Sequence, residues 1–157
     1  MRRVALAPWL GGCLQVRGKL EARMPVTIVR LGTPRKPDEG LRLGTVRRPP
    51  RGVPKADFAK RDFYDVWLPT LAPSEPLLKE ALATHDAKAT HSERAWRAFE
   101  RRYRAEMKRP EAAHLLDVLA ALSHQTNFSV GCYCADESLC HRSILRKLLA
   151  ERGAKMA

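Results

Sequence analysis

Apolar, β-branched runs alternate along the chain with segments that have helical spacing. The clearest run is 26–31, where Val, Ile and Leu are followed by a glycine and then a proline, a pattern typical of a buried strand. A weaker run at 41–46 and a short run at 64–68 predict two more strands. Residues 127–134, which read Asn-Phe-Ser-Val-Gly-Cys-Tyr-Cys, predict a fourth strand in the core.

The strongest helical signal is an apolar stripe that follows a Thr-x-x-Glu capping box at Thr90 and Glu93. The stripe has spacings of three, four and four residues and consists of Trp96, Phe99, Tyr103 and Met107. Three further segments predict helices: about 74–83, from Pro110 onward, and about 139–152. The apolar positions expected on the inner faces of these helices are Leu77, Leu78, Ala81, Leu82, Leu115, Leu116, Leu119, Leu122, Ile144, Leu145, Leu148 and Leu149.

Strands separated by helices predict an α/β fold with a mostly parallel sheet and flanking helices. We expect a single compact domain over residues 24–157, because a chain of 157 residues suits one domain better than two. Residues 1–23 are predicted to be a poorly ordered N-terminal extension. Their basic start imitates a secretory signal, but Pro8 and the pair Gly11-Gly12 interrupt the short apolar stretch.

Basic residues outnumber acidic residues by 29 to 17, which gives a net charge of +12 with histidine neutral. Residues 1–23 hold +4 of this charge, and the predicted domain holds the remaining +8. Such an excess indicates an anionic partner, either a nucleic acid or a smaller phosphate-bearing molecule. Many of the arginines lie on the helix with the aromatic stripe and alternate there with glutamates, which favours a solvated face over a nucleic-acid surface.

Three of the four cysteines lie within the segment 132–143, Cys-Tyr-Cys-Ala-Asp-Glu-Ser-Leu-Cys-His-Arg-Ser. A predicted strand here exits into an acidic loop and then a helix, and ligands of parallel sheets bind where strands end. The first amides of such a helix favour an anion. Cys140 beside His141 is a candidate nucleophile with a lowered pKa. We therefore predict Cys140 and His141 as catalytic residues, with ligand contacts from Asp136, Glu137, Arg142 and Ser143.

Two other interpretations of this segment remain open. Cys132, Cys134, Cys140 and His141 supply four zinc-type ligands, which would suit a zinc-binding or redox protein. Against this, zinc ligand pairs usually have two to four intervening residues, and the first two cysteines are expected on a strand face while the third lies on a helical turn. Alternatively, the cysteines are small buried apolar side chains. We assign no metal and no cofactor.

A second basic segment surrounds the prolines of residues 47–54. Proline stiffens this loop, so its guanidinium groups can be held at a low entropic cost. Arg47 and Arg51 are therefore further candidates for binding an anion, with a solvated surface loop as the alternative.

The segment Cys-x-Asp-Glu-x-x-Cys-His-Arg-Ser that ends at Ser143 resembles the signature of domain of unknown function 488 (DUF488), which includes the YeaO-like proteins. Residues 47–52 resemble that family's Arg-x-x-Pro-Arg-Gly loop, residues 68–74 its Pro-Ser helix entry, and residues 99–107 its Phe-x-x-x-Tyr-x-x-Glu helix. The resemblance covers about 25–153.

The resemblance implies a compact α/β domain in which the Cys-His-Arg turn and the arginine-rich loop lie near one another. It implies no established activity. Many YeaO-like members have Asp-Arg-Leu-Trp-Pro-Arg-Gly in the loop, whereas this chain has Val46 in place of the aspartate and Pro49 in place of the tryptophan. An activity that required that aspartate as a base would be lost here.

Together these observations predict a small cytoplasmic protein that binds a phosphate-bearing metabolite or nucleotide at the Cys-His-Arg segment, with catalysis left undecided. A nucleic-acid-binding module that uses the basic surface is the first alternative. A redox or zinc-binding protein that uses Cys132, Cys134 and Cys140 is the second. No run of apolar residues approaches the length of a membrane span, so we expect no membrane partner.

Overall fold

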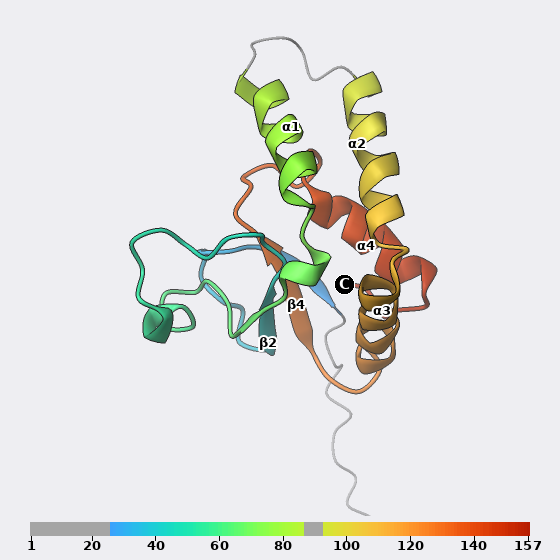
Figure 1. The fold of residues 1–157 in the computed structure, drawn as a ribbon. Coiled ribbons are helices and arrows are strands. Elements are labelled where there is room, and N and C mark those ends of the chain that lie inside the picture. Colours follow the sequence, from blue (N-terminus) through green and yellow to red (C-terminus); the bar gives the residue numbers. More distant parts are fainter. Residues whose placement is uncertain (1–25, 87–92) are drawn as a thin grey trace, which may run out of the picture.

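Four parallel strands form one sheet in the order β1-β4-β2-β3 (Figure 1). The computed structural model describes residues 26–86 and 93–157. The strands, all shorter than predicted, are β1 (Thr27–Arg30), β2 (Leu41–Gly44), β3 (Val66–Trp67) and β4 (Phe128–Cys132). Every residue of β4 is buried, because this strand has a neighbour on both sides.

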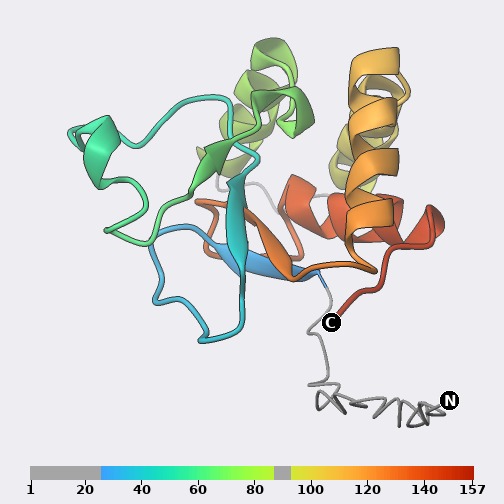
Figure 2. The same ribbon diagram turned by 90° about the horizontal axis from the view of Figure 1, so that it is seen from below.

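The helices are α1 (Glu75–Asp86), α2 (Glu93–Glu106), α3 (Pro110–Leu122) and α4 (His141–Glu151). Two short 3₁₀ helices, η1 (Lys55–Asp57) and η2 (Pro69–Leu71), lie in the connections before α1. Helix α4 packs against β1 and β4, and α2 and α3 pack against α4. The loop with η1 lies on the side of the molecule away from α3 and α4 (Figures 1 and 2). The predicted α/β class with a parallel sheet and flanking helices is confirmed.

The aromatic stripe of α2 does face the core: Tyr103 and Met107 are buried, with Trp96 and Phe99 packed beside them. Two leucines that were expected to face inward are exposed. Leu122 lies on the solvent side of α3, because the buried face of that helix runs through Leu116 and Leu119. Leu82 of α1 is likewise exposed. The capping box at Thr90 and the extension 1–23 lie outside the described residues.

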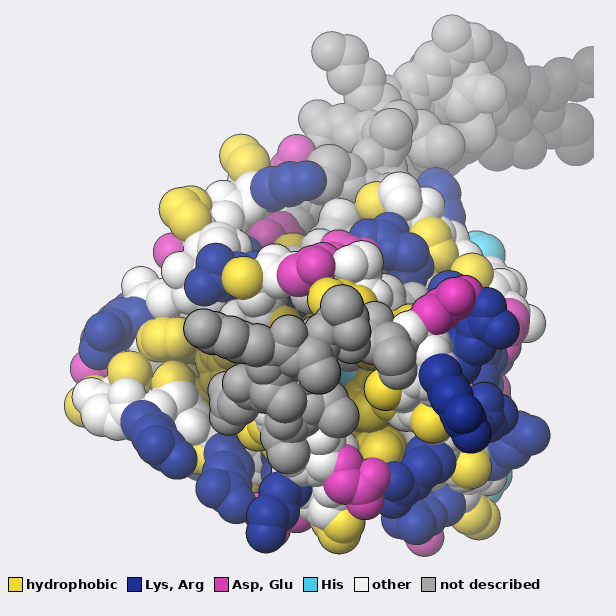
Figure 3. All heavy atoms as spheres, turned by 90° about the horizontal axis from the view of Figure 1, so that it is seen from above, with side chains coloured by type: hydrophobic (Ala, Val, Ile, Leu, Met, Phe, Trp, Pro, Cys, Tyr) yellow, Lys and Arg dark blue, Asp and Glu magenta, His cyan; other side chains and the backbone are white. Residues whose placement is uncertain are grey.

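Among the described residues, positive side chains on the surface alternate with negative ones and do not form one continuous basic patch. Arg97 pairs with Glu93, and Arg102 of α2 pairs with Glu80 of α1. Figure 3 shows Lys and Arg along the rim of the face seen from above, with Asp and Glu between them. None of the helices in the described part of the chain has the length and apolarity needed to cross a membrane.

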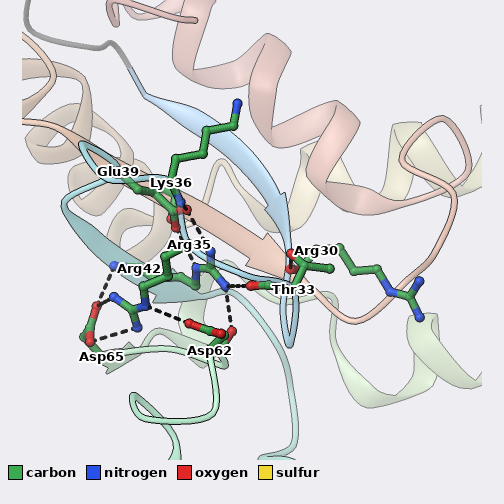
Figure 4. A network of polar contacts seen from close by, with 9 residues as sticks. Arg30, Thr33, Arg35, Lys36, Glu39, Arg42, Asp62 and Asp65 are labelled. Carbon is green, nitrogen blue, oxygen red and sulfur yellow. Dashed lines mark hydrogen bonds and ion pairs between the residues drawn. The ribbon is translucent and has the colours of Figure 1, made fainter.

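A buried ionic network fixes the start of β2 (Figure 4). Arg42 donates from Nε and Nη2 to the carboxylate of Glu39, at 2.6 and 2.7 Å. The hydroxyl of Ser129 on β4 donates to the same carboxylate at 2.6 Å. Asp65 accepts two hydrogen bonds from Arg35 and one from the backbone amide of Arg42. The network thus ties β2 to β4 and to the segment that leads into β3.

Candidate functional site

The carboxyl end of β4 and the amino end of α4 bring three thiols and an imidazole together. We call Cys132, Cys134, Cys140 and His141 the thiol cluster. The sulfur atoms of Cys132 and Cys134 are 3.7 Å apart, and Cys140 Sγ lies 3.7 Å from His141 Nδ1. The ligand atoms of Cys132, Cys140 and His141 all lie within 4.8 Å of one another. Cys132 on the strand and Cys140 at the start of the helix thus lie close together, so their placement on different elements does not argue against a shared site.

The cluster is largely closed to solvent. Cys132 is 7% exposed, Cys140 2% and His141 6%, whereas Cys134 is exposed. Leu31, Val46 and Tyr64 pack around the two buried sulfurs, with Tyr133 also in contact with this group. Access to the cluster therefore lies on the Cys134 side.

His141 has a defined tautomer, set by the backbone of Thr45. Its Nε2 lies 2.8 Å from the Thr45 carbonyl oxygen, which can only accept a hydrogen bond, so Nε2 carries the proton. Burial lowers the pKa of His141 to about 4, which leaves the ring neutral near pH 7. The lone pair of Nδ1 then faces Cys140 Sγ, while the ring of Tyr103 packs edge-on with its centroid 5.5 Å away.

Hydrogen bonds among the three thiols, together with the charge of Arg142, favour one thiolate within the cluster. They lower the pKa of Cys132 although its burial raises it. The same hydrogen bonds to Cys132 raise the pKa values of Cys134 and Cys140. The pKa of Cys140, the nucleophile predicted from the sequence, is therefore raised, the opposite direction to the predicted one.

Arg142 lies inside the protein beside the cluster and holds its loop. It is 3% exposed, and its Nη2 donates to the carbonyl oxygens of Cys134 at 2.8 Å and Ala135 at 3.3 Å. Its Nε is buried without a hydrogen-bond partner among the described residues. A guanidinium group so placed supplies a fixed positive charge to the thiolate.

The other predicted ligand residues take structural partners of their own. Arg47 donates to the carbonyl oxygens of Pro73 and Ala72, at 3.0 and 2.8 Å, and Arg51 is exposed. The remaining three lie in or after the loop: Asp136 accepts from the amide and hydroxyl of Ser138, Glu137 pairs with Arg146, and Ser143 donates to the Cys140 carbonyl. Of the predicted residues, the structure thus places Cys140, His141 and Arg142 at one point.

The start of α4 also differs from the predicted one. The helix begins at His141, and Cys140 is its N-cap residue in an extended conformation, with φ −121° and ψ 144°. No side chain caps it. Asp136 instead accepts a hydrogen bond from the Ser138 amide and so closes a turn within the loop before the helix. This extended cap residue turns the Cys140 side chain back toward β4.

Thr45 and Tyr103 belong to the site although sequence reasoning did not select them. Thr45 is fully buried just beyond β2, and its hydroxyl donates to the Gly131 carbonyl at 2.9 Å. The carboxyl ends of neighbouring parallel strands meet at one sheet edge. That rule would have found Thr45 had the pairing of β2 with β4 been known.

Two kinds of chemistry suit this arrangement. A thiolate, a neutral imidazole with a free lone pair and a fixed cation are the parts of a nucleophilic site. Two cysteines and a histidine are also a ligand set for a thiophilic metal ion, and Cys132, Cys140 and His141 are the residues that could hold one.

A protein-family model described as DUF488-N3a, the active DUF488-N3 subclade, matches residues 26–153. The match contains every strand and helix that the structure describes, together with the whole thiol cluster. Comparison with curated proteins and with solved structures gives no match.

Proposed function

Because this chain belongs to the DUF488 family, in the subclade described as active, we propose that it is an enzyme whose reaction takes place at the thiol cluster. Its substrate is a small molecule with a phosphate or carboxylate group. One observation carries the proposal: two cysteine sulfurs, an imidazole nitrogen and a buried guanidinium group meet where β4 ends and α4 begins.

Each group has a role that its surroundings support. Cys132 and Cys140 supply the sulfur atoms, and His141 Nδ1, which carries the ring's lone pair, lies 3.7 Å from Cys140 Sγ, so these three side chains form the reacting centre. Arg142 and the first amides of α4 supply positive potential for an anionic group of the substrate. Cys134 lies on the exposed side of the cluster, where a substrate would enter.

A small anionic substrate is better supported than a nucleic acid. Basic side chains on α2 pair with glutamates, and Arg104 contacts both Glu100 and Glu151. The aromatic side chains of α2 pack against the core and are not displayed for stacking on bases. Figure 3 shows positive and negative side chains interspersed along one face, not a continuous basic groove.

A ligand panel tests the proposal. Inorganic phosphate, nucleotides, sugar phosphates and small carboxylates would be added to the purified chain and the unfolding temperature measured. A ligand at about 100 times its Kd stabilises the folded state by about 2.7 kcal/mol, so at least one class should raise the midpoint in a concentration-dependent way. No shift with any class would contradict the proposal.

Two variants of α4 locate the binding. Arg142→Gln removes the buried charge beside the cluster, and Arg146→Gln removes a charge from the same helix that pairs with Glu137 at the surface. The ligand shift should be lost in R142Q and kept in R146Q, with circular dichroism confirming that each variant is folded. Equal shifts in both variants would show that the anion binds elsewhere.

Cys134→Ser gives a second test, because Cys134 lies on the exposed side of the cluster. Replacing its sulfur by a smaller oxygen should change the turnover of any substrate that the panel identifies.

A further inference from the structure

We propose that Cys132, Cys140 and His141 form a binding site for one thiophilic divalent metal ion of the zinc type, with a fourth coordination position left to water or substrate. This goes beyond the proposed function, which locates a reaction at the thiol cluster but assigns no metal ion to it. The three residues come from the end of β4 and the first residues around the start of α4, so two rigid elements position the ligand atoms.

The distances suit a tetrahedral ion. With Zn–S bonds of about 2.3 Å and Zn–N bonds of about 2.0–2.1 Å, two ligands on one tetrahedral ion lie about 3.6–3.8 Å apart. Cys140 Sγ and His141 Nδ1 are 3.7 Å apart. The three ligand atoms are mutually within 4.8 Å, at most about 1 Å beyond the tetrahedral spacing.

The imidazole is oriented as metal-bound histidines are. A metal-ligating histidine nearly always donates its other ring N–H to a carbonyl or carboxylate oxygen. His141 does this through Nε2 to the Thr45 carbonyl, at 2.8 Å, and its Nδ1 lies 3.7 Å from Cys140 Sγ. Thr45 is itself held by hydrogen bonds from its amide and hydroxyl to the Gly131 carbonyl. The orientation of the ring is therefore built into the sheet.

Burial is the second argument for an ion. Cys132 and Cys140 are enclosed by Leu31, Val46 and Tyr64, so two sulfur ligand atoms lie side by side away from bulk solvent. A divalent cation would bind both sulfurs as thiolates and balance their charge. Arg142 adds a positive charge nearby without occupying the ligand atoms.

Cys134 is assigned to the outer side of the site. Its sulfur lies 3.7 Å from Cys132 Sγ but is exposed and does not belong to the mutually close set. Its thiol hydrogen-bonds to the Cys132 sulfur, as outer partners of metal-bound thiolates do. Three protein ligands with one position open are typical of catalytic rather than structural zinc sites.

Metal analysis of the full chain tests the site directly. The protein would be purified without added chelator and its metal content measured by inductively coupled plasma mass spectrometry, with about one equivalent of zinc expected. After chelation, addition of Co²⁺ should give the intense visible bands of tetrahedral cobalt with thiolate charge-transfer absorption. Absence of both signals in protein that circular dichroism shows to be folded would overturn the proposal.

Variants then identify the ligands. Loss of a residue that only supports a metal ligand typically weakens metal binding by about 10- to 100-fold. Cys140→Ser and His141→Gln remove ligands themselves, so each should weaken zinc binding by at least that much. His114→Gln, an exposed histidine of α3, is the matched control and should bind as the unchanged chain does. Retention of metal by both ligand variants would refute the assignment. Chelator competition on the unchanged chain provides an independent affinity that does not depend on the folding of the buried variants.

The open position has its own measurement. Cys134→Ser should keep one equivalent of metal and the charge-transfer intensity of two thiolates. Loss of about a third of that intensity would show that the Cys134 thiolate is also a metal ligand. The ion would then have four protein ligands, and the open position would be refuted. These readouts use the metal alone, so they remain separate from the ligand panel: a metal-free protein that still binds an anion refutes this inference and leaves the proposed function standing.

Discussion

Arg42 and Glu39 form an ion pair from which solvent is excluded on both sides. The guanidinium group is 0% exposed and the carboxylate 2% exposed, and two parallel hydrogen bonds join them. The remaining nitrogen, Nη1, donates to the carbonyl oxygens of Thr33 and Asp62. Every part of this buried charge is thus satisfied, which is the condition under which an internal ion pair is tolerated.

Removing one partner of this pair should be costly. Glu39→Gln leaves the Arg42 charge buried without compensation, and we expect the free energy of unfolding to fall by about 3–5 kcal/mol. Glu93→Gln is the control, because Glu93 pairs with Arg97 at the surface and should change stability by less than about 1 kcal/mol. Urea unfolding measures both. Similar losses in the two variants would contradict the importance given to burial.

The same network predicts a loss of stability in acid. Burial raises the pKa of Glu39, but the hydrogen bonds from Arg42, Ser129 and the Lys36 amide outweigh burial, and the net pKa is lowered. Its stabilising effect is therefore complete above the unfolded pKa of about 4.3 and is lost as the pH falls through the lower folded value. Asp65, with a lowered pKa through Arg35, changes in the same direction despite its own burial. Because burial also lowers the pKa of His141 to about 4, the unfolded chain takes up a proton on this residue from about pH 6.5 downward while the folded chain does not, so urea midpoints should begin to fall there. They should fall further below about pH 5 as the carboxylates protonate, and a level profile down to pH 3 would be inconsistent with this account.

Substitution of two glycines by alanine allows the cost of backbone strain to be measured apart from the cost of a steric collision. Gly40 and Gly52 both have positive φ, +73° and +69°. A Cβ at Gly40 would lie 2.0 Å from the Asn127 carbonyl oxygen, whereas one at Gly52 would meet nothing within 4 Å. Gly52→Ala should cost about 1–2 kcal/mol for the left-handed conformation, and Gly40→Ala about 1–3 kcal/mol more. Equal thermal destabilisation of the two variants would show that the loop before β2 moves freely away from β4.

The hydroxyl of Tyr103 anchors η2 below the site. It donates to the Leu71 carbonyl at 2.6 Å in a fully buried position. Tyr103→Phe keeps the ring beside His141 but leaves that carbonyl unpaired, so stability should fall by about 1–2 kcal/mol. Tyr133→Phe loses a longer contact of 3.4 Å to the Arg48 carbonyl and an interaction with the Tyr64 hydroxyl, at a half-buried position, and should cost less than Tyr103→Phe. Guanidinium unfolding of the two variants provides the comparison, and a neutral Y103F would count against the anchoring role.

The elements of the fold were predictable because their signals are local. The spacing from Phe99 to Tyr103 and Met107 gives α2 its buried face, and the apolar runs give the four strands. Arg42 shows the limit of such patterns. A strand arginine is normally expected at the surface, and only the approach of Glu39 and Ser129 makes its burial favourable.

The site was predictable in part for the same reason. Cys140, His141 and Arg142 are consecutive, so their proximity needs no tertiary information. The approach of Cys132 to Cys140 depends on an extended N-cap residue, and the contact of His141 with Thr45 depends on β2 and β4 being neighbours. Neither the cap conformation nor the strand order follows from ligand spacing along the chain.

The position of β4 at the centre of the sheet also governs how the protein can be made. Within the described chain, β1 pairs in the sheet with β4 alone, a strand that the ribosome supplies about 100 residues later. Val26, just before β1, bridges to Met156 at the far end of the chain. During synthesis, β1 therefore has no partner in the sheet until β4 has been made. Because this pairing joins residues far apart in the sequence, closure of the sheet is expected to be slow compared with formation of the helices.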